Sequence, residues 1–151
     1  MKLRNVLPSA AIGLIVLTMA WPARAQSCVP LRVVGGSGTE VNKSVSPPGT
    51  IFSKHNWNTD FVVPRGETFS RFEAEIDPGD SGEYSLKMFL KYNDNTADKV
   101  FDRKSVLLEN GEPIVLTGNV RISEQPYQIN LFVGGIQASG EPYTARVWGC
   151  R

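Results

Sequence analysis

Residues 82–92 read GEYSLKMFLKY, and large apolar side chains occupy every second position from Tyr84 to Tyr92. Serine, lysine and phenylalanine fill the positions between them. A period of two is typical of a β-strand that buries one face and exposes the other. The stretch therefore predicts a long, half-buried strand, which is the strongest local structural signal in the chain.

The same alternation recurs in several further stretches, and turn-forming residues separate them. The apolar members are Phe72, Ala74 and Ile76; Ile114, Leu116, Gly118, Val120 and Ile122; Tyr127, Ile129, Leu131 and Val133; and Tyr143, Ala145 and Val147. The turn formers are Pro47-Pro48-Gly49, Pro64-Arg65-Gly66, Asp77-Pro78-Gly79, Asn110-Gly111, Gly134-Gly135 and Ser139-Gly140. Roughly seven to nine short strands at this spacing predict an all-β fold. We expect a single antiparallel β-sandwich, immunoglobulin-like or jelly-roll, with a small barrel as the alternative and a bulge at Gly118.

The least regular part of the chain is the stretch 37–57, which is rich in Ser, Asn, Pro and Gly. It predicts an edge strand followed by a long loop. Loops of this kind on a rigid sandwich often carry function, although an ordinary connection is the simpler interpretation.

The N-terminal residues 1–25 have the composition of a cleavable signal peptide. Lys2 and Arg4 precede an apolar run, and the small-residue site Ala23-Arg24-Ala25 stands before Gln26. This order predicts export to the periplasm or the cell exterior, with no membrane anchor after cleavage. Residues 26–151 then form one domain, in which 13 basic residues stand against 15 acidic ones. That balance gives no indication of a nucleic-acid partner.

The two cysteines, Cys28 and Cys150, lie near the ends of this domain. An even number of cysteines in an exported protein predicts a disulfide. Such a bond would place the first and last strands side by side.

Motifs for catalysis or for a bound cofactor are missing from the sequence. His55 is the sole histidine, so no pair of histidine ligands can form a metal site. No glycine-rich phosphate loop leads into a helix, and we expect no cofactor and no catalytic residue. Gly79-Asp80-Ser81-Gly82 resembles the serine motif of trypsin-like proteases, but the chain is too short for their double barrel.

One loop is rich in the oxygen ligands that calcium prefers. It contains Asn93, Asp94, Asn95 and Asp98. The spaced acids and closing glutamate of a known calcium loop are missing, so the loop is interpreted as a polar hairpin turn without metal. A calcium-binding β-sandwich remains an alternative.

Three aromatic residues, Phe89, Phe132 and Trp148, lie on the less apolar side of their strands. If these strands are neighbours, the rings would form an exposed patch for a sugar, a peptide or a protein. The alternative is that a loop or the second sheet covers them.

The segments CVPLRVVGG (residues 28–36), NWNTDF (residues 56–61) and YTARV (residues 143–147) resemble small exported proteins of cyanobacteria. The resemblance implies a β-sandwich and adds the thylakoid lumen as a possible location, but it implies no activity and no site residue.

These observations favour a non-catalytic binding or structural module of the cell envelope, whose partner is a protein or a carbohydrate. The alternative is an enzyme or accessory subunit whose site is assembled from scattered Asp, Glu and Tyr residues.

Overall fold

The strand expected around residues 82–92 is present as β6 (Gly82–Lys91), with the predicted alternation of buried and half-buried side chains. The computed structural model describes residues 27–49 and 56–151. The predicted signal peptide and His55 lie outside these residues. In the described part of the chain, no helix is long and apolar enough to cross a membrane.

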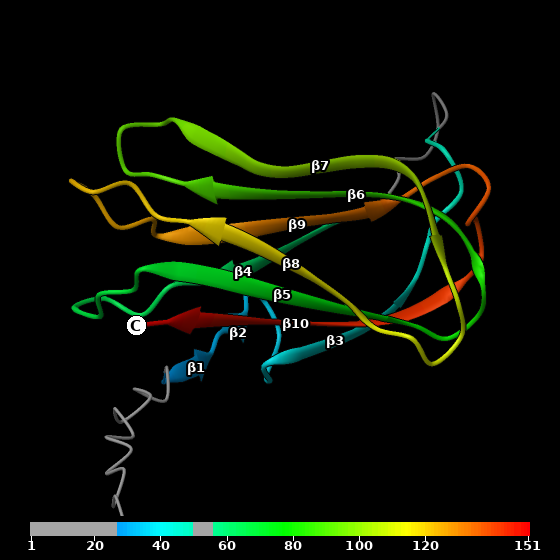
Figure 1. Cartoon of the computed structure of the whole chain (residues 1–151), viewed down its shortest axis with the longest axis horizontal. Helices are drawn as coiled ribbons and strands as arrows, with labels where there is room; N and C mark the ends of the chain where they lie inside the picture. The colour runs from blue at the N-terminus through cyan, green and yellow to red at the C-terminus, as the bar shows by residue number, and fades with distance from the viewer. Residues whose placement is uncertain (1–26, 50–55) are drawn as a thin grey trace, which may run out of the picture.

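Ten strands in these residues form two five-stranded antiparallel sheets packed face to face, which confirms the predicted β-sandwich (Figure 1). Sheet A has the order β1-β10-β5-β8, and β3 also pairs with β10; sheet B has the order β2-β4-β9-β6-β7. The strands are β1 (Cys28–Pro30), β2 (Arg32–Val33), β3 (Glu40–Ser44), β4 (Asn58–Val62), β5 (Arg71–Pro78), β6, β7 (Ala97–Leu108), β8 (Ile114–Asn119), β9 (Gln128–Gly134) and β10 (Pro142–Cys150).

The strand pairs are nested, and this nesting identifies the topology. Strand β6 pairs with β7, β5 with β8, β4 with β9 and β3 with β10. The chain is therefore one long hairpin that wraps around itself. Because β10 also pairs with β5 and β9 with β6, the rolled hairpin divides into two sheets. This is a jelly roll, one of the two sandwich topologies that the sequence left open.

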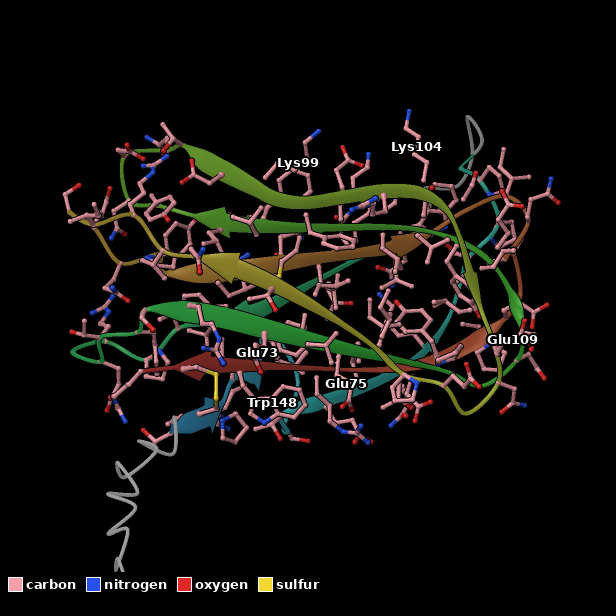
Figure 2. All side chains as sticks on the ribbon, in the orientation of Figure 1. Glu73, Glu75, Lys99, Lys104, Glu109 and Trp148 are labelled. Atoms are coloured by element: carbon pink, nitrogen blue, oxygen red, sulfur yellow. A yellow bond between two sulfur atoms is a disulfide. The ribbon has the colours of Figure 1, made fainter. Side chains whose placement is uncertain are left out.

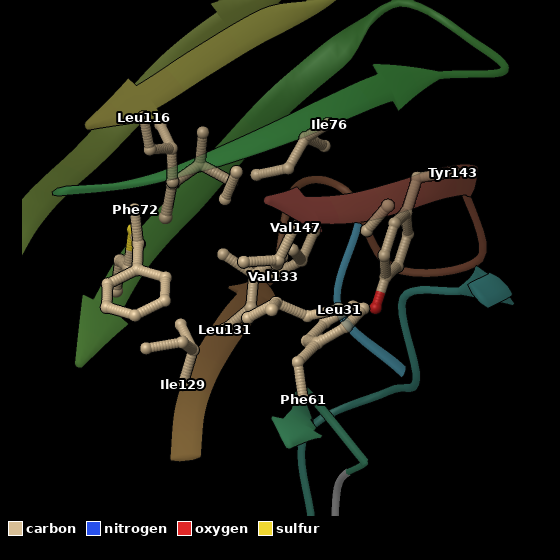
Figure 3. Close-up of a cluster of buried hydrophobic side chains, with 14 of the residues drawn as sticks. Leu31, Phe61, Phe72, Ile76, Leu116, Ile129, Leu131, Val133, Tyr143 and Val147 are labelled. Atoms are coloured by element: carbon tan, nitrogen blue, oxygen red, sulfur yellow. The ribbon is translucent and has the colours of Figure 1, made fainter. Parts of the chain in front are cut away.

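The core lies between the two sheets and consists of the inward side chains of the alternating stretches (Figure 3). Its largest fully buried side chains include Tyr84, Tyr92, Phe61, Phe69, Phe72, Ile76, Leu86, Met88, Leu90, Leu116 and Ile129. Burial of one such side chain contributes about 1.5–3 kcal/mol to stability. The alternation fails at strand ends, since Tyr127 and Ile122 are exposed.

The predicted disulfide between Cys28 and Cys150 is present. The two residues face each other in the ladder between β1 and β10, which confirms that the terminal strands lie side by side (Figure 1). The bond joins residues 122 positions apart. Closing a loop of this length contributes up to roughly 4–5 kcal/mol in the chain-entropy model.

The predicted bulge at Gly118 is wrong. Gly118 pairs regularly with Phe72, and its missing side chain makes room for Val100, whose Cγ2 would lie 2.3 Å from an added Cβ. Irregularity falls instead in β7, where the register against β6 shifts between Tyr84 and Leu86 and again between Met88 and Phe89.

The irregular stretch before β4 contains the expected edge strand. β3 pairs with β10 and ends at Ser44.

Candidate functional site

Two of the three aromatic residues singled out by the sequence share one surface. Phe89 on β6 and Phe132 on β9 are both half-buried, and neither belongs to the core cluster. In the ladder between these strands, Phe89 faces Asn130, and Phe132 faces Lys87. The two rings therefore lie on the outer face of sheet B, one step apart along the ladder.

Trp148 lies elsewhere, so the expectation of one patch made by three rings is wrong. Strand β10 belongs to sheet A, where Trp148 faces Glu73 on β5 and Pro30 on β1. Its ring is on the opposite outer face of the sandwich (Figure 2). The period of two gives the face of a strand that a side chain occupies, but it does not indicate the sheet that the strand joins.

The third aromatic ring of this surface belongs to Trp57, which the alternation did not predict and which contacts the ring of Phe132. The ring centroids are 5.5 Å apart, with an interplanar angle of 89°. The indole Nε1 donates a hydrogen bond of 2.5 Å to the carbonyl oxygen of Ser46. This edge-to-face contact and the hydrogen bond together fix the orientation of the indole.

Glycine at position 134 is required for this arrangement. The indole lies directly over Gly134, where an added Cβ would approach two ring carbons to 2.6 Å. Gly134 thus leaves the space in which Trp57 packs against the sheet.

Trp57 and Phe132 lie in a groove of about 420 Å³ on the outer face of sheet B. This volume is within the usual range of small-molecule sites. We name it the sheet B groove; its lining residues are Trp57, Glu83, Tyr84, Ser85, Lys87, Lys104, Ser105, Phe132, Gly135, Ile136 and Gln137. The wall combines two aromatic rings and the exposed Ile136 with several hydrogen-bonding side chains.

Lys87 brings a positive charge to the aromatic part of the groove. Its ammonium nitrogen lies 4.9 Å from the centroid of the Phe132 ring. A cation over an aromatic face is attracted by the electron-rich face of the ring. This contact orients Lys87 while leaving its N–H donors able to bind a ligand.

Lys104 and Ser105 line the groove at the irregularity of β7 that lies opposite Tyr84 and Leu86. Tyr84 pairs with Val106, whereas Leu86 pairs with Arg103, so β7 carries one extra residue here. Ser105 has a φ of 57°, a left-handed conformation that residues other than glycine rarely adopt. β-Bulges redirect the side chains of an edge strand, and at this one Lys104 and Ser105 line the same groove as Lys87.

The groove lining contains one carboxylate side chain, that of Glu83, whereas the side chain of its neighbour Tyr84 is fully buried in the core. Burial, together with the charges of Glu141 and Asp80, raises the pKa of Tyr84 to about 12. Its hydroxyl donates to the carbonyl oxygen of Asp80 at 3.2 Å. The phenol is therefore protonated and engaged, and the described lining holds no pair of carboxylates of the kind that glycoside hydrolysis uses.

A network of charged and polar side chains lies on the same outer face of sheet B. Asp60 accepts hydrogen bonds from Lys91 at 3.0 Å and from Asn130 at 2.8 Å. Burial alone would raise the pKa of Asp60, but these bonds and one from Gln128 outweigh it and lower the pKa. Because Asp60 and Lys91 neutralise each other, we assign them to the sheet structure.

The acidic loop considered for calcium forms a hairpin turn between β6 and β7, and a guanidinium group lies against it. Arg121 pairs with Asp98 at 2.7 Å and with Asp94 at 3.4 Å, and it stacks over the Tyr92 ring at 3.8 Å. Hydrogen bonds from Thr96 lower the pKa of Asp94, and those from Arg121 lower the pKa of Asp98. The loop carboxylates therefore already have a cationic partner.

Two other places in the described residues offer less to a ligand. Cys28, Cys150 and Glu73 lie close enough to hold a metal, but the two sulfur atoms are bonded to each other. A hollow of about 560 Å³ at one end of sheet A has no aromatic ring other than that of Tyr143 in its wall. Two of its polar side chains, Thr144 and Asn42, hydrogen-bond to each other at 2.7 Å.

No family model matches the sequence, and no curated protein matches it. Solved structures with a similar fold include carbohydrate-binding modules. A mutant of the family 29 module CBM29-2 complexed with mannohexaose is 6% identical, with 83% of this chain and 79% of that chain covered and a TM-score of 0.47. The CBM22-1 xylan-binding domain of Xyn10C from Paenibacillus barcinonensis is 10% identical, with 84% and 86% covered and a TM-score of 0.34. The likeness is one of general architecture and transfers no residue or ligand to this chain.

Proposed function

We propose that this chain is an exported, non-catalytic carbohydrate-binding module whose glycan lies in the sheet B groove. The observation that carries the proposal is the oriented pair of Trp57 and Phe132 rings in a groove that hydrogen-bonding side chains surround. Both rings are partly exposed and lie on the outer face of the sheet.

The chemistry of the groove suits a sugar. A pyranose ring has an apolar face of C–H groups, which packs on an aromatic ring, and an edge of hydroxyls, which need hydrogen-bond partners. Trp57 and Phe132 provide the aromatic surface, while Ser85, Ser105 and Gln137 provide donors and acceptors around it. Because the hydrogen bond to Ser46 already holds the indole, little side-chain entropy is lost on binding.

The strands under the groove argue against an extended peptide as the ligand. β9 pairs with β4 and β6, and β6 pairs with β9 and β7. The backbone groups of β6 and β9 are therefore already used, and β7, the edge strand of sheet B, is irregular where Lys104 and Ser105 line the groove. Recognition over β6 and β9 comes from side chains, and the hydrogen-bonding ones among them suit a ligand with many hydroxyl groups.

The lining also supports binding without catalysis. Glu83 is its one carboxylate, and the Tyr84 hydroxyl is bonded to Asp80. The disulfide between Cys28 and Cys150 supports an oxidising location, which agrees with the predicted signal peptide. We propose the periplasm or the cell exterior as the place of action, with a polysaccharide of the envelope or its surroundings as partner.

The test is affinity electrophoresis and calorimetry against a panel of soluble polysaccharides with Phe132→Ala and Trp148→Ala. Both substitutions remove a half-buried ring from an outer face, but only Phe132 lines the groove. We expect Phe132→Ala to weaken binding about tenfold or more and Trp148→Ala to leave it unchanged, because a central aromatic contact contributes about 2 kcal/mol or more. Equal binding of the polysaccharides by the wild type, Phe132→Ala and Trp148→Ala would refute the proposal. Thermal melts of both variants show whether each remains folded.

A further inference from the structure

Lys87 and Lys104, the basic residues of the groove, form no direct ion pair in the described residues, although Asp102 faces Lys87 in the ladder and attracts both lysines at longer range. Within the described residues, neither Lys87 nor Lys104 has a carboxylate within 4.0 Å. Other basic residues do form ion pairs there: Arg71, Lys91, Lys99, Arg121, Arg146 and Arg151. An ammonium group without a carboxylate in direct contact can donate charge-assisted hydrogen bonds to a negatively charged ligand.

The surrounding charge has the same sign. Strands β6 and β7 together carry five bases against three acids, Glu83, Asp98 and Asp102, and Lys99 pairs with Asp102 at 2.5 Å. The five bases are Lys87, Lys91, Lys99, Arg103 and Lys104.

The outer face of sheet A has the opposite balance, and Figure 2 labels two of its acids, Glu73 and Glu75. Its acids are Glu40, Glu73, Glu75 and Asp77, and its bases are Arg71 and Arg146. The net charge of residues 26–151 is slightly negative. It does not reveal that the two outer faces differ in charge, because it sums over both of them.

The backbone of β7 contributes to the same arrangement. The extra residue in β7 and the left-handed φ of 57° at Ser105 are disfavoured locally, and together they place Lys104 in the groove. Conformations of this kind tend to occur at functional sites, where the rest of the fold maintains them.

The ring pair and the two ammonium groups together define the ligand. We propose, on the basis of the carbohydrate-binding function proposed above, that the ligand of the sheet B groove is an anionic polysaccharide. Its sugar rings pack on Trp57 and Phe132, and its carboxylate or sulfate groups accept hydrogen bonds from Lys87 and Lys104. A nucleic acid carries one phosphate per nucleotide and is bound by denser basic surfaces.

The experiment compares charged glycans with neutral counterparts of the same sugar backbone. Calorimetry would measure binding of polygalacturonate and its methyl ester, of alginate and its propylene glycol ester, and of dextran sulfate and dextran. We expect at least one anionic member to bind about tenfold more tightly than its neutral partner, since a charge-assisted hydrogen bond contributes about 1.5–3 kcal/mol. This difference should shrink as salt is raised from 50 to 300 mM.

Variants separate the role of the lysines from that of total charge. Lys87→Gln and Lys104→Gln should each weaken binding of the charged glycan about five- to tenfold and weaken binding of the neutral one less. Arg32→Gln is the matched control, because it removes one exposed positive charge from β2, the far edge strand of sheet B.

The outcomes distinguish the two proposals. If neutral and charged glycans bind equally and Phe132→Ala abolishes both, the anionic specificity is refuted while the carbohydrate site stands. If Phe132→Ala has no effect on any glycan, or if no glycan of either kind binds, both proposals fail. Stronger binding of single-stranded DNA than of every anionic glycan would likewise overturn the assignment of the ligand.

Discussion

The space over Gly134 gives the most specific structural prediction. In Gly134→Ala, the new Cβ would lie 2.6 Å from two carbons of the Trp57 indole, whereas ordinary contact begins at 3.4 Å. The indole therefore has to recede by about 0.8 Å. Forced repacking of this kind costs about 1–3 kcal/mol. Loss of the hydrogen bond from Trp57 to Ser46 adds about 1 kcal/mol.

We therefore expect a decrease in unfolding free energy of about 2–4 kcal/mol, together with loss of glycan binding. The assay is urea denaturation followed by tryptophan fluorescence. Gly38→Ala is the control, because a Cβ there would meet one atom, the Glu40 nitrogen, at 3.9 Å. In a Trp57→Ala background the added methyl has no ring to meet, so Gly134→Ala should cost almost nothing there. Equal midpoints for Gly134→Ala and Gly38→Ala would refute this account of the groove.

Further predictions concern the disulfide and the acidic turn. Cys28→Ser should lower stability by roughly 2–5 kcal/mol, and unchanged denaturation midpoints with and without reductant would contradict this. The folded-state pKa values of Asp94 and Asp98 lie below their ordinary 3.8, so the unfolded chain takes up protons first, and the stabilisation present at neutral pH is lost as the pH falls below about 4. Arg121→Gln should flatten this acid-side decline in the melting temperature, and an unchanged decline would exclude the ion pairs as its cause. Millimolar calcium should not raise the melting temperature of the wild type, and a rise of several degrees that Asp94→Ala abolishes would make the turn a metal site.

The local pattern of the sequence determined much of the fold. The period of two placed Leu86, Met88 and Leu90 in the core, and the two cysteines joined the terminal strands as expected. Period and turn spacing are local properties, so they can be read without knowledge of distant contacts. The choice between jelly roll and immunoglobulin topology depends on which strands pair across the chain, and no local pattern reports it.

The site was harder to predict for the same reason. Phe89 and Phe132 were correctly placed on an outer face, but Trp148 belongs to the other sheet. Trp57 was missed because it precedes β4 within an irregular stretch and shows no alternation; an isolated tryptophan there was the one available signal. The role of Lys104 depends on a bulge in β7, which has no glycine to mark it.

The most direct test of the carbohydrate site uses two tryptophans as internal probes. In the chain without residues 1–25, Trp57 and Trp148 are the two tryptophans, and each has an indole N–H signal in a proton–nitrogen correlation spectrum. The account predicts that titration with an oligosaccharide of the anionic glycan that binds in calorimetry shifts the Trp57 signal progressively while the Trp148 signal stays in place. A shift of Trp148 alone, or no shift of Trp57 at saturating oligosaccharide, would contradict the claim that the sheet B groove is the binding site.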